Sequence, residues 1–202
     1  MTDIRGIAAF LEKSGKYRGV FFDMDGVVID SGRLWGHIIG GIESKFALDL
    51  SVIGDSGKNS LSSEDAVRLV LERTGRFSPA LYAEILKEIE AVYSESFSSL
   101  VAMKDGIREL LSALKERKVT MALVSNSSAR QVRTVLGHFA LGDFFSATVS
   151  SDDVSEGKPS PEPYLKALEL TGLDAGEVLA LEDSDEGERS AASAAVDCMR
   201  IN

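Results

Sequence analysis

Four carboxylates, one lysine and two small polar residues stand directly after short apolar runs or on the loop that follows one. They are Asp23, Asp25, Ser125, Asn126, Lys158, Glu182 and Asp183. Carboxylates that gather at one place repel one another unless a cation joins them. Their ligand atoms are all oxygens, which suit a hard ion, and Mg²⁺ is the usual one where a phosphate completes the coordination. This set of residues therefore predicts a magnesium site at which a phosphate group binds.

Asp23 and Asp25 are separated by one residue at the end of the apolar run 18–22, and Gly26 follows them. The turn after such a run can aim Asp25 at the same substrate as Asp23. One carboxylate could then attack phosphorus while the other transfers protons. Gly26 would let the backbone turn sharply and expose N–H groups to phosphate oxygens.

Apolar runs alternate with helical patterns over most of the chain, which predicts a parallel sheet with right-handed crossovers. The expected strands are 18–22, 119–124, 147–149, 178–181 and 198–201. The expected helices around them are 4–11, 107–117, 129–139, 161–171 and 188–195. In open sheets of this class, ligands bind beyond the carboxyl ends of the strands. The polar residues that follow the strands should therefore meet at one edge of the sheet.

Residues 34–101 interrupt this alternation, because they show only helical periodicity, over 34–46, 63–74 and 80–98. We interpret this segment as an inserted domain. The sequence thus predicts an α/β core with a doubly wound, Rossmann-like parallel sheet, formed by residues 1–32 and 103–202, and an all-helical cap domain at 33–102. The main loop of the insertion contains Lys58, which we expect to bind the part of a substrate that is not transferred.

The composition is that of a soluble globular protein, with 44% hydrophobic and 27% charged residues among 202. A net charge of −10 argues against a nucleic-acid-binding surface, which needs a basic face. The apolar stretches are far shorter than the ~20 residues of a membrane helix, and the N-terminus lacks the apolar core of a signal peptide. A single cysteine, Cys198, is compatible with the reducing cytoplasm. We expect a cytoplasmic protein without nucleic-acid or membrane partners.

Four segments, taken together, resemble the motifs of the haloacid dehalogenase superfamily in that family's order. They are FFDMDGVVIDS at 21–31, VSNS at 124–127, GKPSP at 157–161, and LEDS at 181–184 with Gly187 three residues further. The helical insertion lies where this family has its cap, and the likeness is closest to the β-phosphoglucomutase and phosphoglycolate-phosphatase branch. The resemblance implies the strand order 5-4-1-2-3 for the core sheet.

The resemblance implies a Mg²⁺-dependent phosphohydrolase for small phosphate esters such as sugar phosphates or phosphoglycolate. Asp23 would be the nucleophile that forms an aspartyl phosphate, and also a metal ligand. Asp25 would be the general acid/base, and its backbone carbonyl would bind the metal. Lys158 would neutralise the transferring phosphoryl group and hold Asp23 in place.

The other four residues would complete the site by the same resemblance. Ser125 and Asn126 would hold the transferring phosphoryl group, while Asp183, with Glu182, would complete the metal site. Three positions depart from the usual family pattern, namely Asp105, Glu188 and Val196. Glu188 stands where an apolar residue usually follows Gly187.

Taken singly, these residues also have structural explanations. Ser125 and Asn126 could cap a helix, Glu182 and Asp183 could be the acidic start of one, and Lys158 could be a solvated loop lysine. The four motifs in order favour the catalytic interpretation. Two functional alternatives remain open. One is a sugar-phosphate mutase, which passes the phosphoryl group to another substrate hydroxyl, and the other is a non-catalytic phosphate-binding module.

Overall fold

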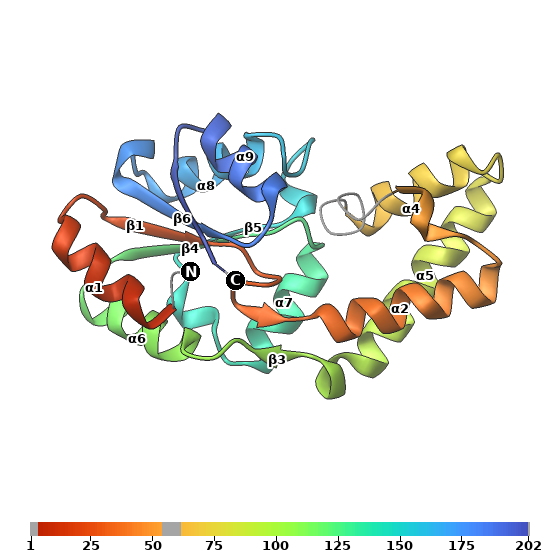
Figure 1. The fold of residues 1–202 in the computed structure, drawn as a ribbon, viewed down its shortest axis with the longest axis horizontal. Coiled ribbons are helices and arrows are strands. Elements are labelled where there is room, and N and C mark those ends of the chain that lie inside the picture. Colours follow the sequence, from red (N-terminus) through yellow and green to blue (C-terminus); the bar gives the residue numbers. More distant parts are fainter. Residues whose placement is uncertain (1–3, 54–61, 202) are drawn as a thin grey trace. The chain divides into compact units, whose positions relative to one another are not determined.

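The computed structural model describes residues 4–53 and 62–201 of the chain. The chain divides into two compact units, one made of Met1–Asp30 and Met103–Asn202, the other of Ser31–Ala102. Both are drawn in Figure 1, coloured along the sequence. The chain thus leaves the first unit once, after Asp30, and re-enters it at Met103.

The described part of the first unit contains a sheet of five parallel strands in the order β5-β4-β1-β6-β7. The strands are β1 (Gly19–Phe22), β4 (Thr120–Val124), β5 (Ala147–Val149), β6 (Val178–Glu182) and β7 (Asp197–Arg200). Counted along the chain, this is the implied order 5-4-1-2-3 read from the opposite edge. The predicted α/β fold with a parallel sheet is confirmed.

Helices cover both faces of this sheet. They are α1 (Ile4–Ser14), α6 (Ile107–Glu116), α7 (Ala129–His138), α8 (Glu162–Thr171) and α9 (Asp185–Ser193), with short 3-10 turns η2 (Gly142–Phe144), η3 (Ser151–Asp153) and η4 (Ala175–Glu177). Figure 1 shows α8 and α9 on one face and α1 and α6 on the other. This arrangement is the doubly wound fold that the alternation of strands and helices predicted.

Helix α9 begins at Asp185, three residues earlier than the sequence predicted. Its N-cap is Ser184, whose Oγ accepts a hydrogen bond from the Gly187 N–H at 3.0 Å. Acidic residues fill the first turn, where they interact favourably with the helix dipole. The apolar periodicity used for the prediction begins only after this polar first turn.

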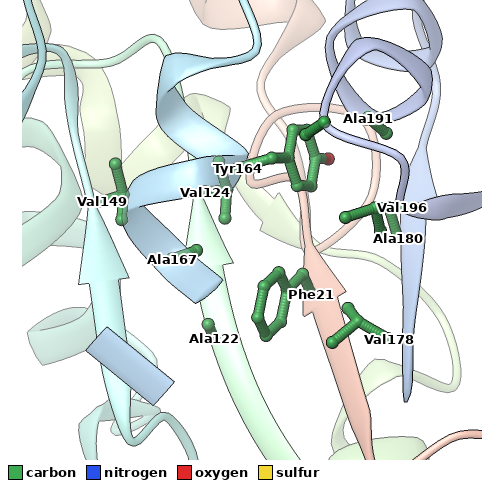
Figure 2. Packing of buried hydrophobic residues seen from close by; sticks show 11 residues of the cluster. Phe21, Ala122, Val124, Val149, Tyr164, Ala167, Val178, Ala180, Ala191 and Val196 are labelled. Carbon is green, nitrogen blue, oxygen red and sulfur yellow. The ribbon is translucent and has the colours of Figure 1, made fainter. Parts of the chain in front are cut away.

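Strand β1 lies at the centre of the sheet, and all four of its residues are buried. Its Phe21 packs into a buried cluster on the face covered by α8 and α9 (Figure 2). The cluster consists of Phe21, Ala122, Val124, Val149, Tyr164, Ala167, Val178, Ala180, Ala191, Ala194 and Val196. A central parallel strand is buried on both faces, which explains why β1 reads as a continuous apolar run.

Over its described residues, the second unit is built from α2 (Gly32–Phe46), η1 (Leu50–Ile53), α4 (Ser63–Arg73) and α5 (Pro79–Leu100). Buried residues recur at helical spacing along α2 and α5, at Leu34, Ile38, Ile42 and Phe46 and at Ile85, Ile89, Tyr93 and Phe97. The short strands β2 (Ile29–Asp30) and β3 (Ala102–Met103) pair as a separate small sheet. None of the described helices is long and apolar enough to cross a membrane.

Candidate active site

The carboxyl ends of adjacent strands bring the predicted residues to one edge of the sheet. Asp23 follows β1, Ser125 follows β4, and Glu182 is the last residue of β6. Backbone pairing continues just past the strand ends. The Asp23 N–H donates to Leu181 O at 3.0 Å, and the Ser125 N–H donates to Val149 O at 2.9 Å. These bonds fix where each functional side chain leaves the sheet.

Lys158 lies between two of the carboxylates, although it belongs to the loop before α8. Its Nζ donates to Asp23 Oδ1 at 2.6 Å, to Glu182 Oε1 at 2.6 Å and to Val124 O at 2.8 Å. Lys158 is 5% exposed and Glu182 is fully buried. Three acceptors satisfy all three donors of the ammonium group, which makes its burial tolerable. Lys158 is therefore a buried ion-pair partner and not a solvated loop residue.

The charges in this cluster shift one another's titration. Burial favours the neutral amine of Lys158, but the charges of Asp23 and Glu182 outweigh it and hold its pKa above the ordinary value. Burial, with a contribution from Glu182, raises the pKa of the Asp23 carboxyl well above its ordinary value despite the opposing effect of Lys158. Burial and the neighbouring acid together thus outweigh the one ammonium in setting the pKa of Asp23.

Asn126 holds the loop that carries Lys158. Its Nδ2 donates to Lys158 O at 3.1 Å, and its Oδ1 accepts from the Lys158 N–H at 2.8 Å. Gly157 lies so close to this amide that a Cβ there would meet Asn126 Oδ1 at 2.6 Å. The sequence predicted Asn126 as a phosphate-binding residue, and it did not predict this contact of the side chain with the Lys158 backbone.

Ser125 and Ser127 connect the end of β4 to Asp25. Ser125 is 2% exposed, and its Oγ accepts a hydrogen bond from the Ser127 N–H at 3.0 Å. The Ser127 Oγ in turn donates to Asp25 Oδ2 at 3.0 Å. Helix α7 is capped further along, by Ser128 in a capping box with Gln131, so neither Ser125 nor Asn126 is its N-cap. Both residues are therefore placed at the site without that structural role.

Asp23, Glu182 and Asp183 form a group whose ligand oxygens all lie within 4.8 Å of one another. The Asp25 carboxylate is not part of this group. Burial, followed by the neighbouring charge of Glu182, raises the pKa of Asp183. Glu182 Oε2 is buried without a hydrogen-bond partner among the described residues. Three oxygen-bearing acids with only one lysine among them fit a hard divalent cation.

Two glycines allow the chain to pass close to the carboxylates of this group. A Cβ on Gly26 would meet Asp183 Oδ2 at 1.8 Å, and a Cβ on Gly187 would meet Glu182 Oε2 at 1.9 Å. Gly26 also has a φ of +84°, in the left-handed region that favours glycine. The sharp turn predicted at Gly26 is present, and the close approach at Gly187 adds a reason for the second glycine.

Two residues contact the site, or residues next to it, without having been predicted from the sequence to do so. Tyr164 of α8 donates its hydroxyl proton to Glu182 Oε1 at 2.5 Å. Arg200 of β7 pairs with Asp185 and Glu188, each at 2.9 Å, which gives the unusual Glu188 a structural partner. Lys58, the residue predicted to bind the substrate's far end, lies outside the described residues.

The close approach at Gly187 predicts that Gly187→Ala destabilises the protein. Helix propensity alone would stabilise α9 by about 1 kcal/mol. The added Cβ would instead displace the Glu182 carboxylate from Lys158 and Tyr164, and overpacking of this kind typically costs about 1–3 kcal/mol. Urea unfolding measures the free energy. Gly137→Ala is the control, because a Cβ there meets nothing within 4 Å. An equal effect of the two substitutions would contradict the packing at Gly187.

Comparison with known proteins agrees with this geometry. Residues 20–201 match the model of the haloacid dehalogenase-like hydrolase family. A phosphorylated carbohydrates phosphatase of Thermotoga maritima is 29% identical, over 88% of this chain and 82% of that protein. A β-phosphoglucomutase of Bacillus subtilis is 27% identical, over 84% of this chain and 76% of that protein.

Solved structures show the same fold. The β-phosphoglucomutase of Clostridium difficile superposes with a TM-score of 0.80 at 20% identity, covering 92% of this chain and 85% of that one. Proteins of this superfamily generally use a divalent metal ion, and Asp23, Glu182 and Asp183 form a group of acids that could hold one. With its four motifs in order and a family match that spans nearly the whole length, this chain belongs to the haloacid dehalogenase-like hydrolase family.

Proposed function

We propose that this protein is a Mg²⁺-dependent phosphatase that hydrolyses small phosphate esters, such as sugar phosphates or phosphoglycolate, through an aspartyl phosphate on Asp23. The observation that carries the proposal is the buried contact of Lys158 Nζ with Asp23 Oδ1 at the carboxyl edge of the sheet. An acid placed there, with a cation fixed against one of its oxygens, is suited to attack an anionic group. The Thermotoga maritima relative, a phosphatase of phosphorylated carbohydrates, supports this substrate class.

Asp23 is the nucleophile in this proposal. A carboxylate oxygen of Asp23 forms a bond to phosphorus in line with the leaving oxygen, whose bond to phosphorus breaks. A water molecule then attacks the same phosphorus atom, releases inorganic phosphate and regenerates the carboxylate. Lys158 holds Oδ1 of Asp23 and so fixes the plane of the carboxyl group. Its positive charge also offsets the charge of the phosphoryl group in both steps.

Asp25 is the general acid and base. It protonates the departing alkoxide in the first step and removes a proton from the attacking water in the second. The Ser127 hydroxyl, which donates to Asp25 Oδ2 at 3.0 Å, restrains its orientation. The Oγ of Ser125 accepts from the Ser127 backbone N–H, and in this proposal its own hydroxyl proton is donated to a phosphoryl oxygen. Asn126 contributes to phosphate binding through the loop that it holds.

Mg²⁺ would be held by the side chains of Asp23, Glu182 and Asp183, together with the backbone carbonyl of Asp25. When bound, it supplies positive charge that stabilises the phosphoryl oxygens during transfer. Its other effect is on the protein's own groups. It relieves the repulsion among carboxylates that Lys158 alone leaves uncompensated.

Residues 33–102 are proposed as the helical cap of a core formed by residues 1–32 and 103–202. A cap that closes over the substrate excludes water before the first transfer and contributes to specificity. Lys58 is proposed to bind the substrate's non-transferring end. We place the protein in the cytoplasm, acting on small molecules and not on nucleic acid or a membrane.

A sugar-phosphate mutase is the second candidate, because the Bacillus subtilis relative is a β-phosphoglucomutase. The two functions differ in the fate of the phosphoryl group. With β-glucose 1-phosphate as substrate, a phosphatase releases inorganic phosphate, whereas a mutase yields glucose 6-phosphate. A non-catalytic binding module would bind phosphate esters and turn none of them over.

A screen of small phosphate esters with and without Mg²⁺ tests the proposal, and we expect hydrolysis that chelation abolishes and Mg²⁺ restores.

Asp183→Asn should weaken Mg²⁺ binding, as measured by calorimetry, because it removes one ligand charge. The affinity of the wild type for Mg²⁺ should rise as the pH increases above 3.8, which is the ordinary pKa of aspartate. The pKa values of Asp23 and Asp183 are raised, so above that pH protons still compete with the metal for these carboxylates. Full activity in excess chelator would refute the metal requirement.

The two jobs of Asp25 predict a dependence on the leaving group. An alkyl ester needs both proton transfers, whereas p-nitrophenolate departs unaided and its ester needs only the second. Asp25→Asn should therefore slow alkyl ester hydrolysis by about 10²–10⁴-fold. On p-nitrophenyl phosphate it should give a burst, equal to the enzyme concentration, followed by slow turnover. Rapid-quench kinetics measure this burst, with Asp23→Asn as the control that should show none. Equal losses on both esters without a burst would contradict the assignment.

A further inference from the structure

Tyr164 is a fully buried residue of α8 whose hydroxyl reaches the site from within the core. It donates to Glu182 Oε1 at 2.5 Å, the same oxygen that accepts from Lys158 Nζ at 2.6 Å. Its ring centroid also lies 5.5 Å from the Lys158 ammonium. A continuous line of contacts therefore runs from Tyr164 through Glu182 and Lys158 to Asp23.

The rest of the Tyr164 side chain is accounted for by packing. Figure 2 shows its ring among the buried apolar residues on the α8 and α9 face of the sheet. A phenylalanine would supply the same ring there without the cost of burying a hydroxyl, which must find a partner. The partner is a carboxylate of the site, so packing alone does not explain the hydroxyl.

The hydroxyl affects how Lys158 is shared between two acids. Its Nζ lies 2.6 Å from both Asp23 Oδ1 and Glu182 Oε1. Glu182 Oε2 has no hydrogen-bond partner among the described residues, so the charge of Glu182 is balanced through Oε1 alone. The Tyr164 proton at Oε1 offsets part of that charge. Without this proton, Glu182 would attract Lys158 more strongly and draw it from Asp23.

We propose that Tyr164 is a positioning residue, whose hydroxyl acts through Glu182 to keep Lys158 directed at Asp23 and at the phosphoryl group. The inference rests on the proposed phosphatase function and adds a residue to its machinery. Tyr164 does not touch the reacting atoms. Its effect reaches Asp23 through three hydrogen bonds, each of which is accepted by a carboxylate, and hydrogen bonds to charged groups are the strongest.

The test is Tyr164→Phe, which removes the hydroxyl and keeps the ring. Hydrogen bonds to charged groups are strong enough that kcat should fall about tenfold or more. The loss should be equal for alkyl and p-nitrophenyl esters, because Lys158 acts on the phosphoryl group and not on the leaving group. Tyr17→Phe is the matched control, since the Tyr17 hydroxyl donates to the Asp197 carboxylate at 2.8 Å elsewhere in the same unit. It should leave kcat unchanged.

Two further measurements separate positioning from a merely structural effect. In a Glu182→Gln background, Tyr164→Phe should cause little additional loss of kcat, because both substitutions disturb the same chain of hydrogen bonds from Tyr164 to Lys158. In ¹⁵N-lysine-labelled protein, the Nζ resonance of Lys158 should shift in Tyr164→Phe and stay in place in Tyr17→Phe. This signal needs no substrate, so it is independent of turnover.

The outcomes distinguish the inference from the function on which it rests. A wild-type kcat in Tyr164→Phe, additive losses in the cycle, or an unmoved Lys158 resonance would each overturn the positioning role. A wild type that hydrolyses no ester would overturn the proposed function instead, and the Lys158 resonance would still decide whether Tyr164 acts on Lys158.

Discussion

The buried ammonium of Lys158, held between Asp23 and Glu182, is the interaction on which the site's architecture depends. Strands β1 and β6 are neighbours, so their carboxyl ends place two acids side by side in the interior. Removing one partner of a buried ion pair typically costs about 3–5 kcal/mol, because an uncompensated charge remains. The loop before α8 must therefore deliver a cation to this point, and Asn126 holds it there by both sides of its amide.

Other residues around the site accommodate the same group of carboxylates. Gly26 and Gly187 lack a Cβ where Asp183 and Glu182 come closest to the backbone. Tyr164 donates a proton to Glu182 from the core side. One lysine is present among three acids, and such an excess of carboxylate oxygens suits a divalent cation at this edge of the sheet. The same charged residues therefore contribute to stability and to the proposed chemistry. We expect a substitution at any of them to affect both.

The sequence predicted the sheet and its acids because both are local signals. Apolar runs that end in Asp23 or Glu182 mark buried strands with polar carboxyl ends, and alternation with helices predicts that these strands run parallel. The order of the strands came from the family resemblance. The contacts between loops were not readable in this way. Lys158 and Asp23 are 135 residues apart, so only the family resemblance suggested that they meet. The Asn126 bonds, which join positions 32 apart, were not predicted. Tyr164 carries no local signal at all, since an aromatic residue on a helix's buried face predicts packing alone.

The stereochemical course at phosphorus tests the central claim that Asp23 takes part covalently. Each in-line transfer inverts the configuration, so transfer to Asp23 and then to water restores it. The measurement uses a phosphate ester made chiral with the three oxygen isotopes, lets an acceptor alcohol take the place of water in the second step, and analyses the configuration of the new phosphate ester. Net retention is the predicted result. Net inversion would show that the acceptor attacks the ester directly, and it would contradict an aspartyl phosphate on Asp23.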